Sequence, residues 1–295
     1  MKIFFDHKIF VNQKYGGPSR YFANLVKELN FLDSTTAKIF APLHINNYLN
    51  NLNKNNIGFS NKFLFQERFA KSPRLNKKLM GLNNYLNKFF FSTFKPDIFH
   101  TTYYNKDFIA NKKKLVVTVF DLIHEIYRKE YNFSKQYLPK KEILNSAEHI
   151  ICISNSTKND LMKYYDIPEK KISVTYLATD FKLIDNQPVL KEKYFLYVGS
   201  RWKYKNFSAL LEVLGYDKNI LQNFKLVIFG GGKLSTEEIE LINKYNIDKT
   251  KIIHFEGDDN LLKSLYKKQN MRVLVFHYWK VFLKNVLFFV VIHLH

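Results

Sequence analysis

The sequence predicts an α/β protein made of two doubly wound parallel sheets, and two observations support this fold class. Short apolar runs typical of buried strands alternate with segments in which apolar residues recur at the three- and four-residue spacing of a helix. The alternation begins again beyond a stretch of mixed charge around Pro188, which has the composition of a linker. Because 295 residues suffice for two domains of ordinary size, we expect a first domain at residues 1–184 and a second at residues 185–295.

The first domain is expected to contain six strands with helices between them. The apolar runs lie at residues 2–5, 37–43, 97–102, 115–121, 149–154 and 171–177. Residues 19–30 are the clearest helix, since their apolar side chains fall on one face. Residues 45–95, rich in Asn, Lys and Phe, are expected to form a loop and an amphipathic helix, and a further helix ends near Ala147. Either Ser154 or Asn155 would cap the helix that follows the fifth strand.

The second domain repeats the pattern with fewer elements. Strands are expected to begin at residues 194, 225, 251 and 271, with helices near 206–215, 235–245 and 259–268. Buried strands that alternate with helices pair in parallel, and such sheets bind ligands at the carboxyl ends of their strands. We therefore expect functional residues just after the strands.

The balance of charge is strongly basic. Lys and Arg number 46 against 26 Asp and Glu, a formal net charge of +20. This excess favours a polyanionic partner, which is nucleic acid, an anionic membrane face or a phosphorylated substrate. A basic surface that is merely solvated, with part of the excess arising from AT-rich codons, is the alternative. The aromatic residues, 17% of the chain, lie in apolar strand runs, a placement that argues against an RNA-stacking sheet and against nucleic acid as the partner.

The cysteine content and the N-terminus bear on the cellular compartment. Cys152 is the single cysteine, which excludes an internal disulfide and a cysteine-based zinc cluster and fits a small core side chain in a reducing cytosol. Asp6 and Lys8 interrupt the first apolar run, as in a strand and not as in a signal peptide. No run approaches the roughly 20 apolar residues of a membrane span. We expect a cytoplasmic protein, with any membrane contact peripheral at the inner face of the plasma membrane.

The most informative stretch runs from Tyr194 to Asn206. Its apolar strand ends on Gly199, and the cations Arg201 and Lys205 follow at once. A buried strand that ends on a glycine, with cations on the next loop, is a typical seat for phosphate in an α/β protein. Arginine can grip a diphosphate with two parallel N–H groups and lysine with a point charge. A solvated basic loop is the alternative.

Two further glycine pairs follow strands. Gly16 and Gly17 precede the first helix, where backbone N–H groups and a helix N-terminus can approach a ligand oxygen, with a plain turn as the alternative. Gly230 and Gly231 end the strand that starts at residue 225 and permit close backbone approach. Their spacing is not the G-x-G-x-x-G fingerprint, and a tight turn is the alternative. Glu256 ends the next strand and is a candidate for base or ribose contacts.

Asp121 and His124 follow the strand at residues 115–121. A histidine there can hydrogen-bond a sugar hydroxyl or orient a leaving group. A structural histidine and a helix-capping aspartate are the alternatives. The sequence has no H-E-x-x-H, G-x-x-x-x-G-K-[ST] or G-x-S-x-G motif, so these familiar chemistries are absent.

Taken together, these motifs resemble the GT-B glycosyltransferases, specifically the family-four (group 1) retaining enzymes such as mannosyltransferases. The resemblance runs from residue 1 to about residue 276, and its segments keep the order and spacing of the family. They include GGPSRYFANLVKEL, VVTVFDLIHE, YFLYVGSRWKYKN and LVIFGGG. The resemblance implies two Rossmann-like domains that face a cleft, with the second domain incomplete.

The same resemblance implies transfer of a hexose such as mannose from a nucleotide sugar to a glycan or polyprenyl-diphosphate-linked acceptor, in the synthesis of a cell-surface polysaccharide such as lipopolysaccharide. Arg201 and Lys205 would hold the donor diphosphate and stabilise the leaving group. Gly17 would lie under the donor or acceptor, and His124 would face the transferred sugar. The family needs no metal and no other cofactor, because these cations replace it. The basic surface would suit an acceptor at an anionic leaflet.

The chain departs from the family pattern after residue 276. The family has a Glu-Gly-Phe-Gly loop there, whose acids contact the donor sugar and ribose, whereas no acidic residue follows Asp259 in this chain. Codons for Tyr278–Phe282, read in a shifted frame, can encode Leu-Glu-Gly-Phe. We therefore expect a frameshifted, truncated gene whose product has lost part of its donor site, a loss that leaves open whether the chain is an active or an inactive transferase. A divergent short terminus is the alternative reading of these residues.

Two other functions stay open at this point. One is a non-catalytic sugar- or nucleotide-binding remnant or partner subunit. The other is a basic nucleic-acid-binding protein.

Sequencing of the locus tests the frameshift hypothesis. The expected result is a shifted downstream frame that encodes the acidic loop. An intact downstream frame without such codons would contradict it.

Overall fold

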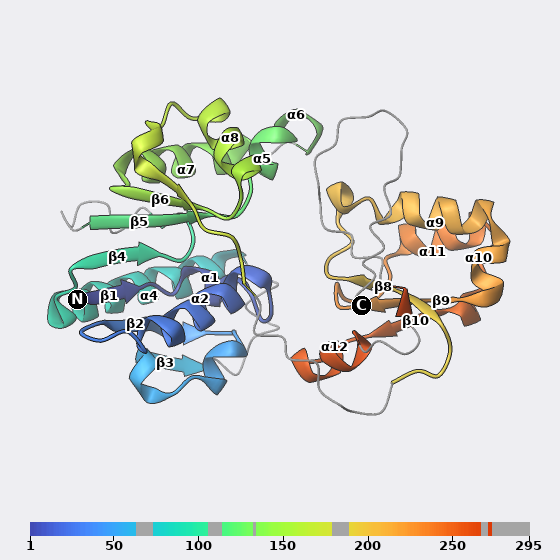
Figure 1. Ribbon diagram of the computed structural model, residues 1–295, viewed down its shortest axis with the longest axis horizontal. Helices are drawn as coiled ribbons and strands as arrows, with labels where there is room; N and C mark the ends of the chain where they lie inside the picture. The colour runs from blue at the N-terminus through green and yellow to red at the C-terminus, as the bar shows by residue number, and fades with distance from the viewer. Residues whose placement is uncertain (63–72, 106–113, 132–133, 179–188, 267–270, 273–295) are drawn as a thin grey trace. The chain divides into compact units, whose positions relative to one another are not determined.

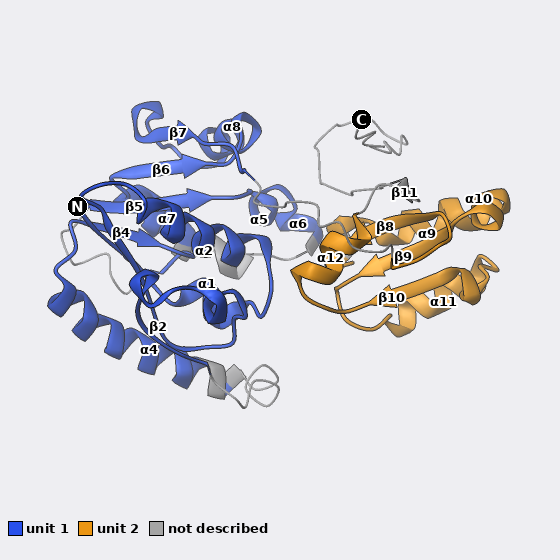
Figure 2. Cartoon of the chain, turned by 60° about the horizontal axis from the view of Figure 1, so that its bottom comes forward, with its two compact units in different colours: residues 1–178 blue, residues 179–295 orange. Residues whose placement is uncertain are grey.

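The computed structural model describes residues 1–62, 73–105, 114–131, 134–178, 189–266 and 271–272. The chain divides into two compact units, Met1–Ala178 and Thr179–His295, which Figure 2 shows in different colours. The predicted boundary near residue 185 and the proposed frameshift beyond residue 276 lie outside the described residues. Within the described part of the chain, no helix is long and apolar enough to cross a membrane.

Unit 1 is built on a seven-stranded sheet in which every neighbouring pair is parallel (Figure 1). The strands are β1 (Lys2–Phe5), β2 (Thr36–His44), β3 (Ile57–Lys62), β4 (Ile98–Thr101), β5 (Lys114–Val119), β6 (His149–Cys152) and β7 (Ile172–Val174). Their order is β3-β2-β1-β4-β5-β6-β7, so the strand order reverses between the central strands β1 and β4. Ligands of doubly wound sheets bind beside such a reversal, at the carboxyl ends of the strands.

Helices cover both faces of this sheet. They are α1 (Lys8–Asn12), α2 (Gly17–Leu29), α4 (Pro73–Phe94), α5 (Ile123–Ile126), α6 (Arg128–Tyr131), α7 (Ser134–Ser146) and α8 (Asn155–Tyr164), with the 3-10 turns η1 (Tyr48–Asn51), η2 (Lys54–Asn56) and η4 (Glu169–Lys171). Side chains alternate across β1, so Phe4 packs on Phe91 of α4 with ring centroids 5.2 Å apart, whereas Phe5 packs on Phe22 of α2 at 6.0 Å. Two hydrophobic cores result, one on each side of the sheet.

Two elements of unit 1 differ from the prediction. Residues 8–12 form α1, although the first apolar run predicts a strand and a loop. The helix begins there because the Asp6 carboxylate accepts a hydrogen bond from the Lys8 N–H (3.4 Å) and Thr102 Oγ1 accepts one from the Ile9 N–H (3.1 Å). β3 lies where a loop is predicted. The prediction missed it because this edge strand pairs on one side only and has mostly polar side chains, so its apolar pattern is weak.

Unit 2 repeats the same strand order. Its parallel strands are β8 (Tyr194–Val198), β9 (Lys225–Phe229), β10 (Ile252–Phe255) and β11 (Met271–Arg272). Their order, β10-β9-β8-β11, matches β3-β2-β1-β4 of unit 1, with β8 in the place of β1. Its helices are α9 (Phe207–Tyr216), α10 (Lys218–Asn223), α11 (Thr236–Lys244) and α12 (Asp259–Leu265), with the 3-10 turns η5 (Lys203–Lys205) and η6 (Lys249–Lys251). The predicted doubly wound α/β fold is confirmed in both units.

Cys152 and Ser154 take the roles predicted for them in unit 1. Cys152 is buried, and burial raises the pKa of its thiol to about 12, so the side chain packs as a small apolar group. Ser154 caps α8, where its Oγ accepts a hydrogen bond from the Thr157 N–H (3.1 Å). β7 covers only part of the predicted strand at residues 171–177.

Buried histidines make the stability of unit 1 depend on pH. His100 on the central strand β4 lies against the rings of Phe5 and Phe22 and shares a hydrogen bond with Thr118 Oγ1 (2.9 Å). Burial lowers the pKa of His100 to about 3 and the pKa of His44 to about 4. An unfolded histidine binds its proton near pH 6.5. The stability that comes from a neutral buried ring is therefore complete above that pH and declines as the pH falls from 6.5 towards 3.

We expect acidification from pH 6.5 to pH 5 to reduce the free energy of unfolding by about 2 kcal/mol through His100 alone. Urea unfolding of the full chain, followed by circular dichroism, measures this change. The His100→Gln variant keeps a polar partner for Thr118 and should lose about that much of the pH dependence. His149→Gln on β6 is the matched control. Equal pH dependence in the His100→Gln variant and the wild-type chain would contradict the assignment.

Candidate functional site

The predicted site residues lie just beyond the carboxyl ends of strands in both units, at the edge where parallel sheets bind ligands. In unit 1 they are Gly16 and Gly17 at the start of α2, and Asp121 and His124 after β5. In unit 2 they are Gly199, Arg201 and Lys205 after β8, Gly230 and Gly231 after β9, and Glu256 after β10.

A buried carboxylate holds the carboxyl edge of unit 1 together. Asp6 follows β1 and is fully buried. Its oxygens accept hydrogen bonds from the Thr102 N–H (2.9 Å), from Thr101 Oγ1 (3.2 Å) and from Asn105 Nδ2 (2.9 Å). The ends of the two central strands are thereby tied to each other. The sequence signal for this contact was the charge of Asp6, which interrupts the first apolar run.

The start of α2 leaves its backbone accessible. Gly17 is exposed, and a Cβ atom built on it would meet no atom within 4 Å. Behind it, Gln13 Oε1 accepts a hydrogen bond from the Ser19 N–H (3.3 Å), and a Cβ atom on Gly16 would overlap this Gln13 side chain. Tyr21 of the same helix packs on Phe120, with ring centroids 5.4 Å apart, which joins this helix to the end of β5.

Asp121 and His124 form the turn that follows β5. The exposed Asp121 carboxylate accepts a hydrogen bond from the Ile123 N–H (3.2 Å) at the start of α5. His124 is partly exposed, and its pKa is lowered by burial and by the positive charge of Lys140. The ring is therefore neutral at neutral pH, when it can both donate and accept a hydrogen bond.

A buried ion pair that the sequence did not reveal lies beneath this turn. Lys140 Nζ donates to Glu125 Oε2 (3.1 Å) and to the Asp121 carbonyl (3.2 Å), and both charged side chains are almost fully buried. The Tyr165 hydroxyl donates to the other Glu125 oxygen (2.5 Å). The Lys140 ammonium also lies 4.9 Å from the centre of the Tyr104 ring. Desolvation lowers the pKa of Lys140, but the adjacent carboxylate opposes that shift.

In unit 2, glycines shape the turns beyond β8 and β9. Gly199 has a φ of 106°, and Gly230, Gly231 and Gly232 have φ values of 78°, 76° and 74°. Residues that carry a side chain rarely adopt this left-handed backbone conformation, so these four positions favour glycine strongly. A Cβ atom on Gly231 would lie 2.6 Å from the Gly199 carbonyl oxygen and 2.8 Å from Arg201 Nη1. The two turns are therefore packed directly against each other.

Arg201 joins these two turns. All three nitrogens of its guanidinium donate hydrogen bonds, and only 4% of its side chain is exposed. They reach the carbonyls of Gly230 (3.0 Å), Gly232 (2.9 Å) and Lys233 (2.9 Å), and the carboxylate of Glu238 (2.8 Å). The structure thus brings Arg201 together with Gly199, Gly230 and Gly231. Its predicted contact with a diphosphate stays a prediction.

Two residues that sequence reasoning missed complete this arrangement. Glu238 forms a capping box with Ser235 at the start of α11, and its second oxygen is the one that holds Arg201. The sequence Ser-Thr-Glu-Glu at 235–238 carries the capping-box signal. His254 Nε2 donates to the Gly230 carbonyl (3.1 Å), a contact for which the sequence gives no signal.

Lys205 is the second predicted cation of this loop. It ends η5, is partly buried, and lies with its ammonium 5.3 Å from the centre of the Tyr204 ring. Asn206 then precedes α9 at the predicted helix start, where it has a left-handed conformation (φ 53°) and no side-chain capping hydrogen bond. Glu256 is exposed beyond β10.

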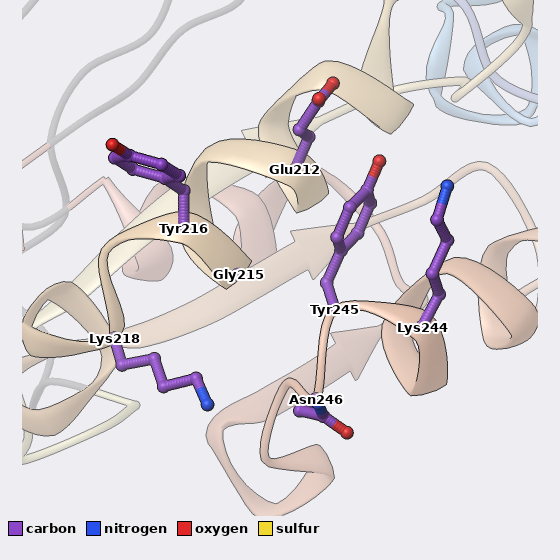
Figure 3. A pocket seen from close by; sticks show the side chains of 7 residues that line it. All are labelled: Glu212, Gly215, Tyr216, Lys218, Lys244, Tyr245 and Asn246. Carbon is purple, nitrogen blue, oxygen red and sulfur yellow. The ribbon is translucent and has the colours of Figure 1, made fainter.

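A shallow pocket of about 340 Å³ lies elsewhere in unit 2, where α9 and α11 end (Figure 3). Its lining includes Glu212, Tyr216 and Lys244, and none of the predicted site residues. Helices that cross between parallel strands end at the amino edge of the sheet, so this pocket lies away from the carboxyl edge.

Two sequence models of known families match the chain. One is described as Glycosyltransferase Family 4 and matches residues 15–183, more than half of the chain. The other is described as Glycosyl transferases group 1 and matches residues 180–282.

Curated relatives and solved structures agree with these matches. The chain is 30% identical over 166 residues to the N-acetylgalactosamine-N,N'-diacetylbacillosaminyl-diphospho-undecaprenol 4-alpha-N-acetylgalactosaminyltransferase of Campylobacter jejuni subsp. jejuni serotype O:2, covering 54% of this chain and 44% of that protein. It is 28% identical over 174 residues to the O-antigen chain mannosyltransferase RfbU of Salmonella typhimurium, covering 57% and 46%. The chain thus spans about half the length of the curated relatives it matches.

The fold comparison includes WaaG, a glycosyltransferase involved in lipopolysaccharide biosynthesis. Its crystal structure matches with a TM-score of 0.60 at 12% identity, covering 89% of this chain and 72% of that chain. At this identity the likeness concerns the fold alone, and it agrees with the predicted GT-B class.

The Arg201→Lys substitution tests the clamp between the two turns. Lysine keeps the charge, but one ammonium cannot bridge three carbonyls and a carboxylate, so we expect unit 2 to lose about 2 kcal/mol of stability. Urea unfolding followed by tryptophan fluorescence reports on this unit, because Trp202 and Trp279 both belong to it. The exposed Lys244→Arg variant is the control and should shift by less than about 0.5 kcal/mol. An unchanged midpoint for Arg201→Lys would contradict the clamp.

Proposed function

Because the chain belongs to glycosyltransferase family 4, we propose that it transfers a sugar from a nucleotide-sugar donor to an acceptor. The observation that carries this proposal is the Arg201-clamped glycine turn, with Lys205 on the same loop as Arg201, at the ligand-binding edge of unit 2. A nucleotide sugar has a diphosphate that such an edge can bind. Sugar transfer leaves negative charge on that diphosphate, and fixed cations lower the barrier by stabilising this charge.

The two cations are proposed to act differently on the donor. Lys205 contacts the diphosphate as a point charge. Arg201, whose charge is paired with Glu238, acts through its hydrogen bonds, which hold the turn of Gly230–Gly232 so that backbone can come close to the phosphate oxygens. Glu256, exposed at the end of the neighbouring strand, is proposed to contact the ribose. The cations supply the positive charge, so the proposal includes no metal and no other cofactor.

Unit 1 is proposed to contribute the sugar contacts and the acceptor side. The neutral ring of His124 can hydrogen-bond the transferred sugar, and Asp121 and Gly17 lie on the same edge of the sheet. The ion pair of Glu125 and Lys140 positions this turn from below, because it holds both α5 and the Asp121 carbonyl.

The finer assignment draws on the relatives. One is named a mannosyltransferase of the O-antigen chain, and the name of the other describes a diphospho-undecaprenol substrate. We accordingly propose a hexose such as mannose as the transferred sugar and a glycan or polyprenyl-diphosphate-linked acceptor in cell-surface polysaccharide synthesis. The proposed place of action is the cytoplasmic side of the plasma membrane, with peripheral contact to anionic lipid.

Calorimetric titration with UDP-linked and GDP-linked hexoses tests the donor site. We expect one of them to bind and Lys205→Ala to weaken that binding by about tenfold or more, because a charge-assisted contact to the diphosphate is lost. Lys244→Ala is the matched control, since it removes the same charge from the same unit at the pocket of Figure 3. Absence of binding to every nucleotide sugar, or equal weakening by both variants, would overturn the donor site.

The same titrated protein then enters a turnover assay with a polyprenyl-diphosphate-linked acceptor. Transfer above the buffer rate that falls in His124→Ala, without loss of donor affinity, supports the enzyme. Donor binding without any transfer or hydrolysis identifies a non-catalytic binding protein instead.

A further inference from the structure

The outer side of α4 presents large apolar side chains that unit 1 does not bury. Leu82, Tyr85 and Phe89 are 48%, 72% and 63% exposed. Their spacing of three and four residues places them along one face of the helix, which we call the outer α4 face. A contiguous row of exposed apolar side chains is typical of an interaction surface.

The opposite side of α4 is fixed to the sheet, so the outer α4 face is a stable surface. Asn83 lies over the end of β2, where its Oδ1 accepts from the Leu43 N–H (2.8 Å) and its Nδ2 donates to the Leu43 carbonyl (3.1 Å). One turn later, Asn87 Nδ2 donates to the Phe40 carbonyl (3.0 Å). Both asparagines are fully buried, and Phe91 continues this side into the core.

The apolar surface continues from α4 onto the edge strand β3. Phe89 lies against Phe90, with ring centroids 5.6 Å apart, and Phe90 stacks on Phe59 of β3 at 4.8 Å. Phe59 is itself 40% exposed. The aromatic surface is therefore continuous across two elements and is not a single misplaced side chain.

Exposed cations accompany this apolar surface on the same two elements. The 22 residues of α4 include no Asp and no Glu, and their exposed cations are Arg74, Lys77, Lys78 and Lys88. Lys62, at the end of β3, is also exposed. Exposed aromatic and apolar side chains among Lys and Arg are the composition of a helix that lies in the plane of an anionic bilayer surface.

The register of α4 relates this surface to the candidate site. Asn83 bonds at the carboxyl end of β2, whereas the Phe94 carbonyl accepts from Lys2 Nζ (3.5 Å) at the start of β1. The basic N-terminal half of α4 is therefore at the carboxyl edge of unit 1, the edge that carries Gly17 and His124. A bilayer on the outer α4 face would lie beside that edge.

We propose that the outer α4 face, with Phe59, binds the surface of a bilayer that contains anionic lipid. The aromatic rings and Leu82 enter the interface, and the lysines pair with lipid phosphates. The choice of a bilayer as the partner rests on the proposed function, in which the acceptor is lipid-linked. A second copy of the chain fits less well, because a symmetric pairing of this face would set its cations against each other.

Sedimentation of the full chain with vesicles tests the proposal. We expect binding to phosphatidylcholine vesicles that contain about 30 mol% phosphatidylglycerol, little binding to phosphatidylcholine alone, and loss of binding in about 0.5 M NaCl. A Tyr85→Ser/Phe89→Ser double variant should lower the partition coefficient by about tenfold or more. Tyr176→Ser/Tyr216→Ser removes two rings elsewhere that are at least about as exposed, and it is the matched control. Equal binding by the two double variants, or no binding of the wild-type chain to anionic vesicles, would overturn the proposal.

A fluorescent label gives a second readout that does not depend on loss of binding. Tyr85→Cys and the control Tyr216→Cys each introduce an exposed thiol, while the buried Cys152 has a thiol pKa near 12 and does not compete for the label. An environment-sensitive dye at residue 85 should shift to the blue with anionic vesicles, and the dye at residue 216 should not. An equal response at both positions would contradict insertion of the outer α4 face.

Two further measurements separate the alternatives. Sedimentation velocity of the wild-type chain and of the Tyr85→Ser/Phe89→Ser variant reveals a dimer that depends on this face, an outcome that would replace the bilayer by a second copy. Nucleotide-sugar titration of the same variant should match the wild-type result. The vesicles contain neither donor nor acceptor. If the wild-type chain binds a nucleotide sugar but not anionic vesicles, only this inference is overturned. If it binds anionic vesicles but no nucleotide sugar, only the proposed function is overturned.

Discussion

Every strand of a parallel sheet must leave the sheet at the carboxyl edge, and the backbone groups of the turns there still require hydrogen-bond partners. The two units satisfy this requirement with charges of opposite sign. In unit 1 the buried carboxylate of Asp6 accepts hydrogen bonds from the end of β4. In unit 2 the guanidinium of Arg201 donates hydrogen bonds to the carbonyls that follow β9. The same strand order is thus closed by an anion in one unit and by a cation in the other.

This difference bears on which ligand each edge can receive. In unit 2, Arg201 holds turns made of glycine, whose backbone N–H groups are not covered by side chains. Such turns suit a phosphate group. The edge of unit 1 has its carboxylate buried and presents a neutral histidine and open backbone instead. Such groups suit the hydroxyls of a sugar. The family membership and the local chemistry rest on separate observations, and both agree with the proposed nucleotide-sugar substrate.

The parts of the fold that could be predicted are those whose signal lies within a few neighbouring residues. The apolar runs of β1, β5 and β8 predicted central strands because both faces of each are buried. β3 escaped prediction because an edge strand needs fewer apolar side chains. The site divides in the same way. The loop after Gly199 was identifiable from its glycine and cations, but the partners of Arg201 lie 29 to 37 residues further on. The pair of Glu125 and Lys140 depends on how α7 packs against α5, which no local pattern encodes.

The run of Gly230, Gly231 and Gly232 restricts how the protein can evolve. Each of these residues has a backbone conformation that a side chain would strain, and the middle one has no room for a Cβ atom. Most single-base changes in these codons introduce a side chain and therefore carry a penalty in stability. In the proposed donor site, a change of donor preference would therefore arise more readily at the side chains of Lys205 and Glu256 than in the backbone of this turn.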